Sequence, residues 1–193
     1  MAYQIVHLGE MIEVLGENKC KQLFANFSCP LDSDIEYFLK EKAILFQKMA
    51  VSRTYLVYTS YKNENVLVGY FALSSKGLSV RRNVSATLRK KITGSKSREI
   101  TAIPVFLIGQ LSKNYADNLD KLSLISGAEL LRMAFRKIIE AQRLTGGRII
   151  LVECIDNKKL EEFYTRHGFI FLDKDGNDGL FRYIREINGI CIV

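Results

Sequence analysis

The side chain best suited to donate a proton lies on a short helix that is predicted from Asn157 to His167. The phenol of Tyr164 has an ordinary pKa of about 10, so it is protonated at neutral pH and can give its proton to a leaving group. Phe163 and Tyr164 could instead form one aromatic ridge that packs this helix against a sheet. Asn157 could hydrogen-bond a ligand or cap the first turn of the helix. Both pairs of alternatives stay open at this stage.

A second candidate site is Ser126-Gly127-Ala128, at the start of a long helix predicted through Leu144. Free backbone amides and the positive end of a helix can bind a phosphate without any side chain. Small residues let phosphate oxygens approach the backbone. Ser126 could instead be an ordinary N-cap that needs no ligand. We favour a phosphate site because the segment lies between a strand and a helix.

The sequence does not indicate a metal site, a disulfide or a membrane span. His7, His167 and four widely spaced cysteines form no metal-ligand cluster and no CxxC pair. No apolar run approaches the ~20 residues that span a bilayer, and the first residues lack the pattern of a signal peptide. We therefore expect a reduced, cytoplasmic protein without structural zinc.

The net charge of +7 comes from one segment, residues 81–98, which contains seven basic residues and no acidic ones. The rest of the chain carries equal numbers of basic and acidic residues. A localised basic segment can attract nucleic acid, a phosphorylated cofactor or an acidic partner. The alternative is a solvated helix face followed by a flexible loop. For a nucleic-acid partner, the expected contacts are Arg89, Lys90 and Lys91.

The elements that must position these residues predict one mixed α/β domain over residues 1–193. The chain has no internal repeat and no linker-like segment. Pro104 predicts an irregularity near the start of the central strand. In chain order we expect an extended start, helices over 8–24 and from Asp32 or Ser33 to 50, a hairpin of strands 54–61 and 66–75, a helix over 80–92, a mobile loop over 94–97, a buried strand over 100–111, a helix from 127 to 144, a strand over 148–154, a helix over 157–167 and strands over 168–172 and 180–187.

The stretch ECIDNKKLEEFYTRHGF, residues 153–169, resembles the strand-helix-strand end of the GCN5-related N-acetyltransferase (GNAT) superfamily. In that superfamily a strand is followed by an Asn, a short helix with a Phe-Tyr pair and a Gly-Phe turn. The segments FSCPLDSDIEYFLKEKA and IPVFLIGQL similarly resemble acetyltransferase toxins that modify aminoacyl-tRNA. The resemblance covers nearly the whole chain. It implies a single-domain GNAT fold, with a mixed, mostly antiparallel sheet, splayed central parallel strands and flanking helices.

The resemblance also implies an acetyl-CoA-dependent N-acetyltransferase that acetylates a primary amine, with aminoacyl-tRNA as the toxin-like acceptor. Tyr164 would protonate the departing thiolate of coenzyme A. The pantetheine arm would lie between the strands around 106–112 and 149–154. Gly109 would allow a close backbone approach there, or would mark only a strand bulge. The implied cofactor-binding residues are Ile108, Gly109, Gln110, Leu111, Ser126, Gly127, Ala128 and Asn157.

Two departures from the superfamily pattern leave a rival interpretation open. The usual Gln/Arg-x-x-Gly-x-Gly/Ala loop is replaced here by LSLISG, residues 122–127, or by the same frame shifted to end at Ala128. The central strand carries no carboxylate after Glu99, so the general base is unassigned. Glu153 could serve if it faces the slot, or could be an exposed strand glutamate without a chemical role. The rival is a catalytically silent GNAT-fold protein that binds a partner through residues 81–98. A homodimer and an antitoxin partner are further partners that the toxin likeness allows.

Overall fold

The computed structural model describes residues 2–119, 121–176 and 178–190. Two compact units divide the chain. The first contains Met1–Ser74 and Gly109–Ala134, and the second contains Ser75–Ile108 and Phe135–Val193. Two strands and one helix begin in one unit and end in the other, so neither unit is contiguous in sequence. The expectation of a single domain stays a prediction.

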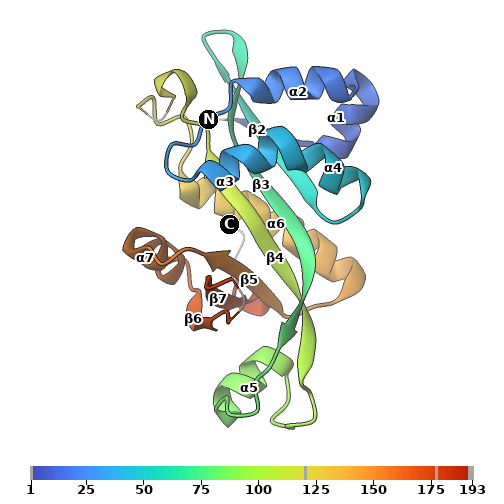
Figure 1. Ribbon diagram of the computed structural model, residues 1–193, viewed down its shortest axis with the longest axis vertical. Coiled ribbons are helices and arrows are strands. Elements are labelled where there is room, and N and C mark those ends of the chain that lie inside the picture. Colours follow the sequence, from blue (N-terminus) through green and yellow to red (C-terminus); the bar gives the residue numbers. More distant parts are fainter. Residues whose placement is uncertain (1, 120, 177, 191–193) are drawn as a thin grey trace. The chain divides into compact units, whose positions relative to one another are not determined.

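The first unit contains an antiparallel set of strands (Figure 1). β1 (Tyr3–His7) pairs with β2 (Arg53–Tyr61), and β2 pairs with the first part of β3 (Glu64–Ser79). The β2–β3 turn is a two-residue loop at Lys62-Asn63, where φ is 51° and 65°. Positive φ at both central positions is the geometry that suits a tight hairpin. The predicted hairpin is therefore confirmed, with a shorter loop than the 62–65 we expected.

The helices of the first unit differ from the expected pair in one respect. The predicted helix over 8–24 is two helices, α1 (Leu8–Leu15) and α2 (Glu17–Ala25). Gly16 separates them because its φ of 77° is a conformation that a helix does not contain. Asp32 caps the next helix as expected, by accepting from the Asp34 amide at 2.9 Å. That helix comprises α3 (Ser33–Tyr37), a π-helical turn (Phe38–Lys42) and α4 (Ala43–Lys48).

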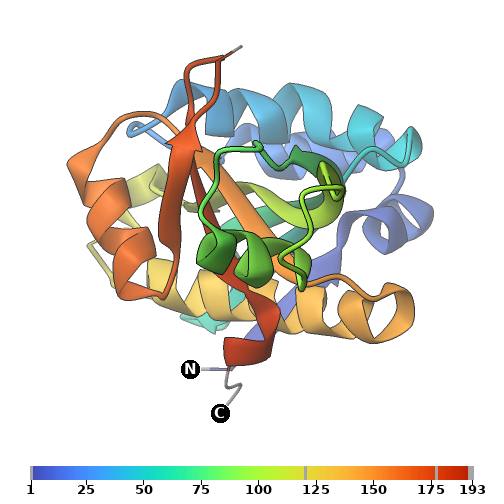
Figure 2. The ribbon, with the colours of Figure 1, turned by 90° about the horizontal axis from the view of Figure 1, so that it is seen from below.

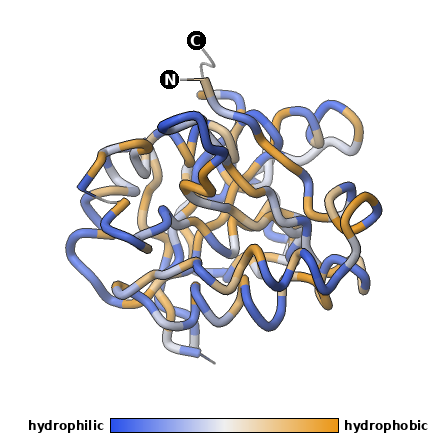
Figure 3. Tube along the Cα trace, turned by 90° about the horizontal axis from the view of Figure 1, so that it is seen from above, coloured by the Kyte–Doolittle hydropathy of each residue, from blue (hydrophilic) through white to orange (hydrophobic). Residues whose placement is uncertain are grey.

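The strands of the first unit are covered on both faces. α1 to α4 lie on one face, and the first turns of α6 (Gly127–Thr145) lie on the other (Figures 1 and 2). Orange and blue alternate along the helices in Figure 3, the pattern of helices with one apolar side. The apolar sides bury a core that includes Leu8, Phe24, Leu39, Leu56 and Tyr70. This core fixes the strands from which the candidate residues of this unit project.

The second unit contains the parallel pair that the GNAT resemblance implies. β4 (Ala102–Lys113) pairs in parallel with β5 (Ile149–Cys154) over three positions, from Phe106↔Ile150 to Ile108↔Val152. β5 then pairs antiparallel with β7 (Phe181–Glu186), which pairs antiparallel with β6 (Ile170–Lys174). α7 (Lys158–Arg166) connects β5 to β6. The expected strand-helix-strand-strand end of the chain is confirmed.

Hydrogen bonding gives the strand order β1-β2-β3-β4-β5-β7-β6, so the predicted mixed, mostly antiparallel α/β class is confirmed. Two short 3₁₀ turns, Ala116–Asn118 and Ile187–Gly189, complete the described elements. A buried cluster in the second unit includes Leu78, Ile92, Val105, Leu151 and Ile184.

The helix predicted over 80–92 is shorter than expected and begins later in the chain: α5 spans Ala86–Thr93. Ser85 starts it by accepting from the Leu88 amide at 3.2 Å.

Candidate active site

The start of α6, in the first unit, is closed by its own side chains. Ser126 accepts from the Glu129 amide at 3.1 Å through Oγ, and the Ser126 amide and hydroxyl both donate to Glu129 Oε2 at 2.7 Å. This reciprocal pair is a capping box. The hydroxyl of Tyr3 has one proton to share between two acceptors, Glu129 Oε1 at 3.0 Å and the Leu124 carbonyl oxygen at 2.8 Å. A carboxylate of the protein thus lies at the helix terminus where we expected a phosphate.

The charge of Glu129 is stabilised by these contacts. Burial alone would raise its pKa, but the hydrogen bonds from Ser126 and Tyr3 outweigh burial and lower the pKa. Burial and the bond to Glu129 together raise the pKa of Tyr3 to about 12. Glu129 is therefore anionic and Tyr3 neutral at neutral pH. Of the two alternatives for Ser126-Gly127-Ala128, the structure shows the N-cap directly. Phosphate binding there would need Glu129 to release the Ser126 amide.

Gln110 on β4 carries an unsatisfied polar atom in the first unit. Its Oε1 is buried and has no hydrogen-bond partner among the residues that the structure describes. A buried acceptor left unpaired costs about 1–3 kcal/mol, so such atoms in native proteins commonly mark a missing ligand or water. The pantetheine arm of coenzyme A carries amide N–H donors. Gln110 therefore fits the cofactor-binding role that the resemblance implies.

Tyr164 lies in the second unit, on the buried face of α7. Its ring packs against Phe163, Phe169 and Tyr183, with ring centroids 5.2, 5.4 and 6.1 Å away. Burial, and then the neighbouring Cys154, raise the pKa of Tyr164 well above the ordinary value. The aromatic-ridge interpretation of Phe163-Tyr164 is therefore correct as a description of packing. The raised pKa keeps the phenol protonated at neutral pH and also makes it a weaker acid, so packing by itself does not exclude a role as proton donor.

Cys154 ends β5 and is a free thiol. Burial, followed by the negative charge of Asp156, raises its pKa to about 11. A thiol with such a pKa is not a nucleophile at neutral pH, because the thiolate is the reactive form. Cys20 and Cys29 are also free and are buried, whereas Cys191 lies outside the described residues.

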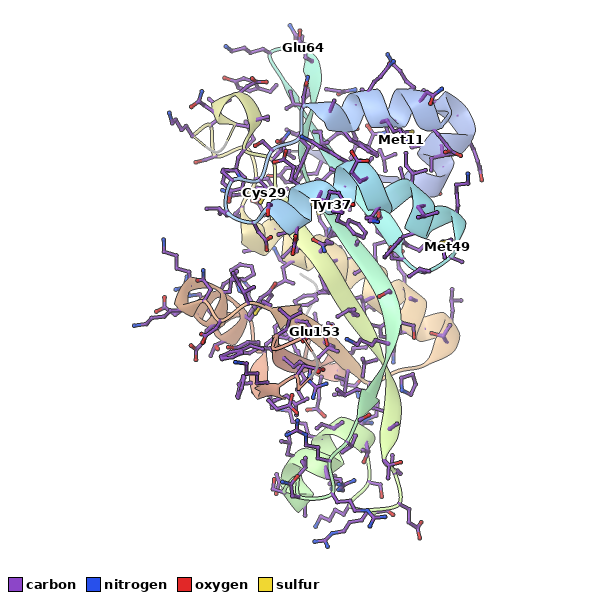
Figure 4. All side chains as sticks on the ribbon, in the orientation of Figure 1. Met11, Cys29, Tyr37, Met49, Glu64 and Glu153 are labelled. Atoms are coloured by element: carbon purple, nitrogen blue, oxygen red, sulfur yellow. The ribbon has the colours of Figure 1, made fainter. Side chains whose placement is uncertain are left out.

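Asn157 caps α7, because its side chain accepts from the Lys159 amide at 2.9 Å. Capping alone accounts for the position of this side chain. Glu153 on β5 (Figure 4) is engaged as well: Lys76 Nζ lies 2.7 Å from both of its carboxylate oxygens. Lys76 also lines a groove of about 340 Å³ between Ser75–Gly77 and Ala102–Pro104. The candidate base is thus half of a partly buried ion pair.

Arg89, which we expected to contact nucleic acid, is instead an internal anchor of the second unit. It is 1% exposed, and its guanidinium donates to the carbonyl oxygens of Arg81 at 2.6 Å, Ile100 at 3.0 Å and Ser97 at 3.5 Å. The expectation that Arg89 contacts a phosphate is wrong, because its donors face these carbonyls. Lys90 on the same helix is exposed and Lys91 is half-buried, so both remain accessible to a partner.

The candidate residues thus form two local groups. In the first unit, Gly109, Gln110 and Leu111 follow one another on β4, and Ser126, Gly127 and Ala128 start α6. In the second unit are Ile108, Asn157 and Tyr164. The sequence analysis missed Tyr3, Glu129 and Lys76. The Ser-x-x-Glu spacing at 126–129 was a signal for the capping box, whereas nothing in the sequence pairs Tyr3 with Glu129 or Lys76 with Glu153.

Solved structures share this arrangement of elements over most of the chain. A tyrosine-to-phenylalanine mutant of KacT has a TM-score of 0.69 and 22% identity, and the match covers 97% of this chain and 96% of that chain. AtaT complexed with acetyl-methionyl-tRNAfMet has a TM-score of 0.69 and 19% identity, with the same coverage of 97% and 96%. A mutant AtaT toxin bound to acetyl-CoA and the C-terminus of the antitoxin AtaR has a TM-score of 0.61 and 19% identity, over 86% of each chain. No family profile and no curated protein matches the sequence.

The chain therefore has the GNAT fold, in the form found in the KacT and AtaT toxins. At this level of identity the comparison establishes the fold, and function has to be argued from the site. None of the described helices is both long and apolar enough to cross a membrane.

Proposed function

We propose that this protein transfers the acetyl group of acetyl-CoA to a primary amine, and that the amine is the α-amine of an aminoacyl-tRNA. The proposal is supported by the fold that the chain shares with AtaT, whose solved forms include a complex with acetyl-methionyl-tRNAfMet. Within this chain, the observation that carries it is the Lys76–Glu153 ion pair. That pair bears directly on which amine the site can use.

The ion pair leaves the two parallel strands without an unengaged carboxylate. β4 contains no Asp or Glu, and the single carboxylate of β5, Glu153, is held by Lys76 at 2.7 Å. A site without a general base depends on an acceptor that is already neutral. An α-amine with a pKa of 7.7–8.0 is roughly a third neutral at pH 7.5, whereas a lysine amine with a pKa of 10.4 is neutral in about one molecule per thousand. The arrangement thus favours an α-amine acceptor over a lysine side chain.

Acetyl-CoA would supply the activated acetyl thioester. Gln110 Oε1 would accept a hydrogen bond from the pantetheine arm and so orient it, in line with the unpaired state of that oxygen. Small residues at Ser126-Gly127-Ala128 would admit the pyrophosphate to the backbone amides of α6 once Glu129 has released them. Tyr164 Oη would donate its proton to the departing sulfur, and the proton that the attacking amine loses would restore the phenol, directly or through water. Ile108, Gly109, Leu111 and Asn157 stay proposed cofactor contacts.

A direct assay tests the function. Purified protein would be incubated with acetyl-CoA and either aminoacyl-tRNA, an amino-acid ester or a lysine peptide blocked at its N-terminus, and products would be weighed by mass spectrometry. We expect acetylation of the first two acceptors, with little product from the blocked peptide at pH 7.5. Preferential acetylation of the lysine peptide would overturn the assignment of the acceptor. Absence of acetyl transfer to any amine would overturn the proposal that the protein is an acetyltransferase.

The second candidate is a catalytically silent GNAT-fold protein that binds a partner through residues 81–98. One observation favours it, namely that the Glu129 carboxylate lies at the α6 terminus in place of a phosphate. Calorimetric titration with acetyl-CoA separates the two candidates, because the silent protein needs no cofactor. For the enzyme we further propose a cytoplasmic location. An antitoxin partner, as in the AtaT structure bound to AtaR, and a homodimer are likewise proposals.

A further inference from the structure

The basic residues lie in a closed excursion of the chain between β3 and β4, residues 80–101, which we call the α5 segment. Its two ends meet where the Val80 amide donates to the Thr101 carbonyl at 2.8 Å. α5 is the single helix of the segment, and Ile92 on this helix is buried in the core cluster of the second unit. The segment is thus attached to the second unit at its base and through one face of its helix.

Arg89 is the centre of this segment. Its guanidinium joins the Arg81 carbonyl, near the beginning of the segment, to the carbonyls of Ser97 and Ile100, near its end. A buried guanidinium is costly unless its donors are satisfied, and the planar fork of arginine can satisfy several acceptors at once. Arg89 therefore connects parts of the segment that no regular structure joins.

The loop after α5 is held by a series of local hydrogen bonds, although we expected it to be mobile. The Thr93 hydroxyl donates to the Ser95 carbonyl at 2.8 Å and accepts from the Ser95 amide at 3.1 Å. The Ser97 amide then donates to Ser95 Oγ at 3.0 Å, and the Glu99 amide to Ser97 Oγ at 3.2 Å. Serine and threonine side chains that bond nearby amides in this way fix turns without a helix or strand.

The guanidinium of Arg89 is bonded inside the segment, whereas most of the other basic side chains of the segment are exposed. The segment contains no carboxylate between Arg81 and Arg98. Arg81 lies 3.6 Å from Asp173, so part of its charge is already balanced within the second unit. The other exposed basic side chains of the segment are Arg82, Lys90, Lys96 and Arg98.

We infer that the α5 segment binds the phosphate backbone of the RNA acceptor, with Arg82, Lys90, Lys96 and Arg98 as contacts and Arg89 as the positioning residue that holds them in place. This inference rests on the proposed function, because the proposed aminoacyl-tRNA acceptor is the reason for choosing RNA as the partner. Phosphate contacts position a nucleic acid without reading its sequence, and a set of lysines and arginines held on one short segment suits that task.

The contacts are tested with fluorescein-labelled deacylated tRNA, by anisotropy from 50 to 250 mM KCl. Lys90→Ala combined with Lys96→Ala should lower the affinity at least tenfold at low salt. It should also reduce the slope of log affinity against log salt by about 1.4–1.8, since each lost phosphate contact removes about 0.7–0.9. The matched control removes the same charge from exposed positions on α2, as Lys19→Ala with Lys21→Ala. Equal losses in the two double variants would overturn the inference.

The positioning role is tested with Arg89→Lys, which keeps the charge but not the planar fork. We expect weaker tRNA binding together with faster amide exchange confined to residues 80–101, and unchanged exchange in β5 and β7. Binding equal to that of the wild type in a folded Arg89→Lys protein would overturn the role of Arg89. If Arg89→Lys unfolds the whole protein, the exposed Lys90/Lys96 pair still decides whether the segment binds RNA.

The outcome also separates this inference from the proposed function. In one outcome, tRNA binding is salt-sensitive and is lost in the Lys90/Lys96 variant, but the wild type does not acetylate an amino-acid ester. This would overturn the proposed enzyme activity and support the RNA-binding segment. Acetyl transfer by the wild type, without salt-sensitive tRNA binding, would do the opposite. Binding of an acidic peptide but not tRNA would overturn the choice of RNA as the partner.

Discussion

The hydroxyl of Tyr3, on the first strand of the chain, donates a hydrogen bond of 3.0 Å to the carboxylate of Glu129, in the first turn of α6. The same hydroxyl bonds the Leu124 carbonyl at 2.8 Å, so one phenol fixes both the loop before α6 and the side chain that caps it. Glu129 therefore competes directly with any anion that approaches the amides of this helix. Removing the charge of Glu129 therefore tests whether this helix terminus only caps the helix or also binds an anion.

Glu129→Gln should strengthen the binding of acetyl-CoA. Glutamine can still cap the helix, but it carries no negative charge to repel the pyrophosphate. A charge at a helix terminus is worth about 0.3–1 kcal/mol, so the dissociation constant should fall roughly two- to fivefold in a calorimetric titration. Glu13→Gln, at an exposed position on α1, provides the charge-matched control and should leave affinity unchanged. Unchanged or weaker binding in Glu129→Gln would mean that the pyrophosphate does not bind at this terminus.

Tyr164→Phe should lower turnover by roughly 10²-fold or more while leaving the affinity for acetyl-CoA nearly unchanged, because it removes a proton donor and keeps the ring. Steady-state kinetics combined with calorimetry measures both quantities. Tyr183→Phe is the control, since it removes a buried phenol that stacks on Tyr164 with a centroid distance of 6.1 Å. If Tyr164→Phe is as active as the wild type, the phenol contributes packing alone.

Gln110→Met should affect function and stability differently. The substitution removes the buried, unpaired Oε1 at similar volume, so the melting temperature should stay the same or rise. Loss of one neutral hydrogen bond should weaken acetyl-CoA binding by roughly 0.5–1.5 kcal/mol, about two- to twelvefold in dissociation constant. Gln22→Met, at an exposed position on α2, controls for the change of side chain. Unaltered affinity in Gln110→Met would show that this oxygen does not face the cofactor.

Alkaline pH should destabilise the folded protein. Burial, followed by the bond to Glu129, raises the pKa of Tyr3 to about 12, and burial also raises the pKa of Tyr58, Tyr70, Tyr164 and Tyr183. The unfolded phenols lose their protons near pH 10, before the folded ones do. The stabilisation is therefore complete below about pH 10 and is lost as the pH rises toward 12.

Urea unfolding followed by circular dichroism at pH 9, 10.5 and 11.5 measures this effect. The midpoint should fall steeply between the last two values. Tyr3→Phe should be less stable than the wild type at pH 9, because it lacks both hydrogen bonds, and the difference should shrink as the pH approaches 12. A difference that is constant with pH would contradict the assigned role of the Tyr3 hydroxyl.

The sequence by itself determined the class of fold and the positions of most elements. The apolar runs of β4 and β5 and the Asn157 cap are local features, and local propensities act through neighbouring residues. Hence the helix caps at Asp32 and Asn157 and the strand-helix-strand-strand end were predictable. Gly16 was a local signal too, but the apolar spacing on either side of it suggested one continuous helix.

Only the tertiary structure decided which polar groups are already hydrogen-bonded or ion-paired within the protein. Arg89 lies in a basic run and was expected to face solvent, yet it is buried because carbonyls at residues 81, 97 and 100 converge on it. Glu129 is bonded by Tyr3 across 126 residues, and Glu153 by Lys76 across 77. A sequence pattern gives the spacing of residues along the chain, whereas partners this far apart are set by how the strands pair and the helices pack. The availability of a charge, and with it the chemistry of the site, is therefore a property of the folded protein.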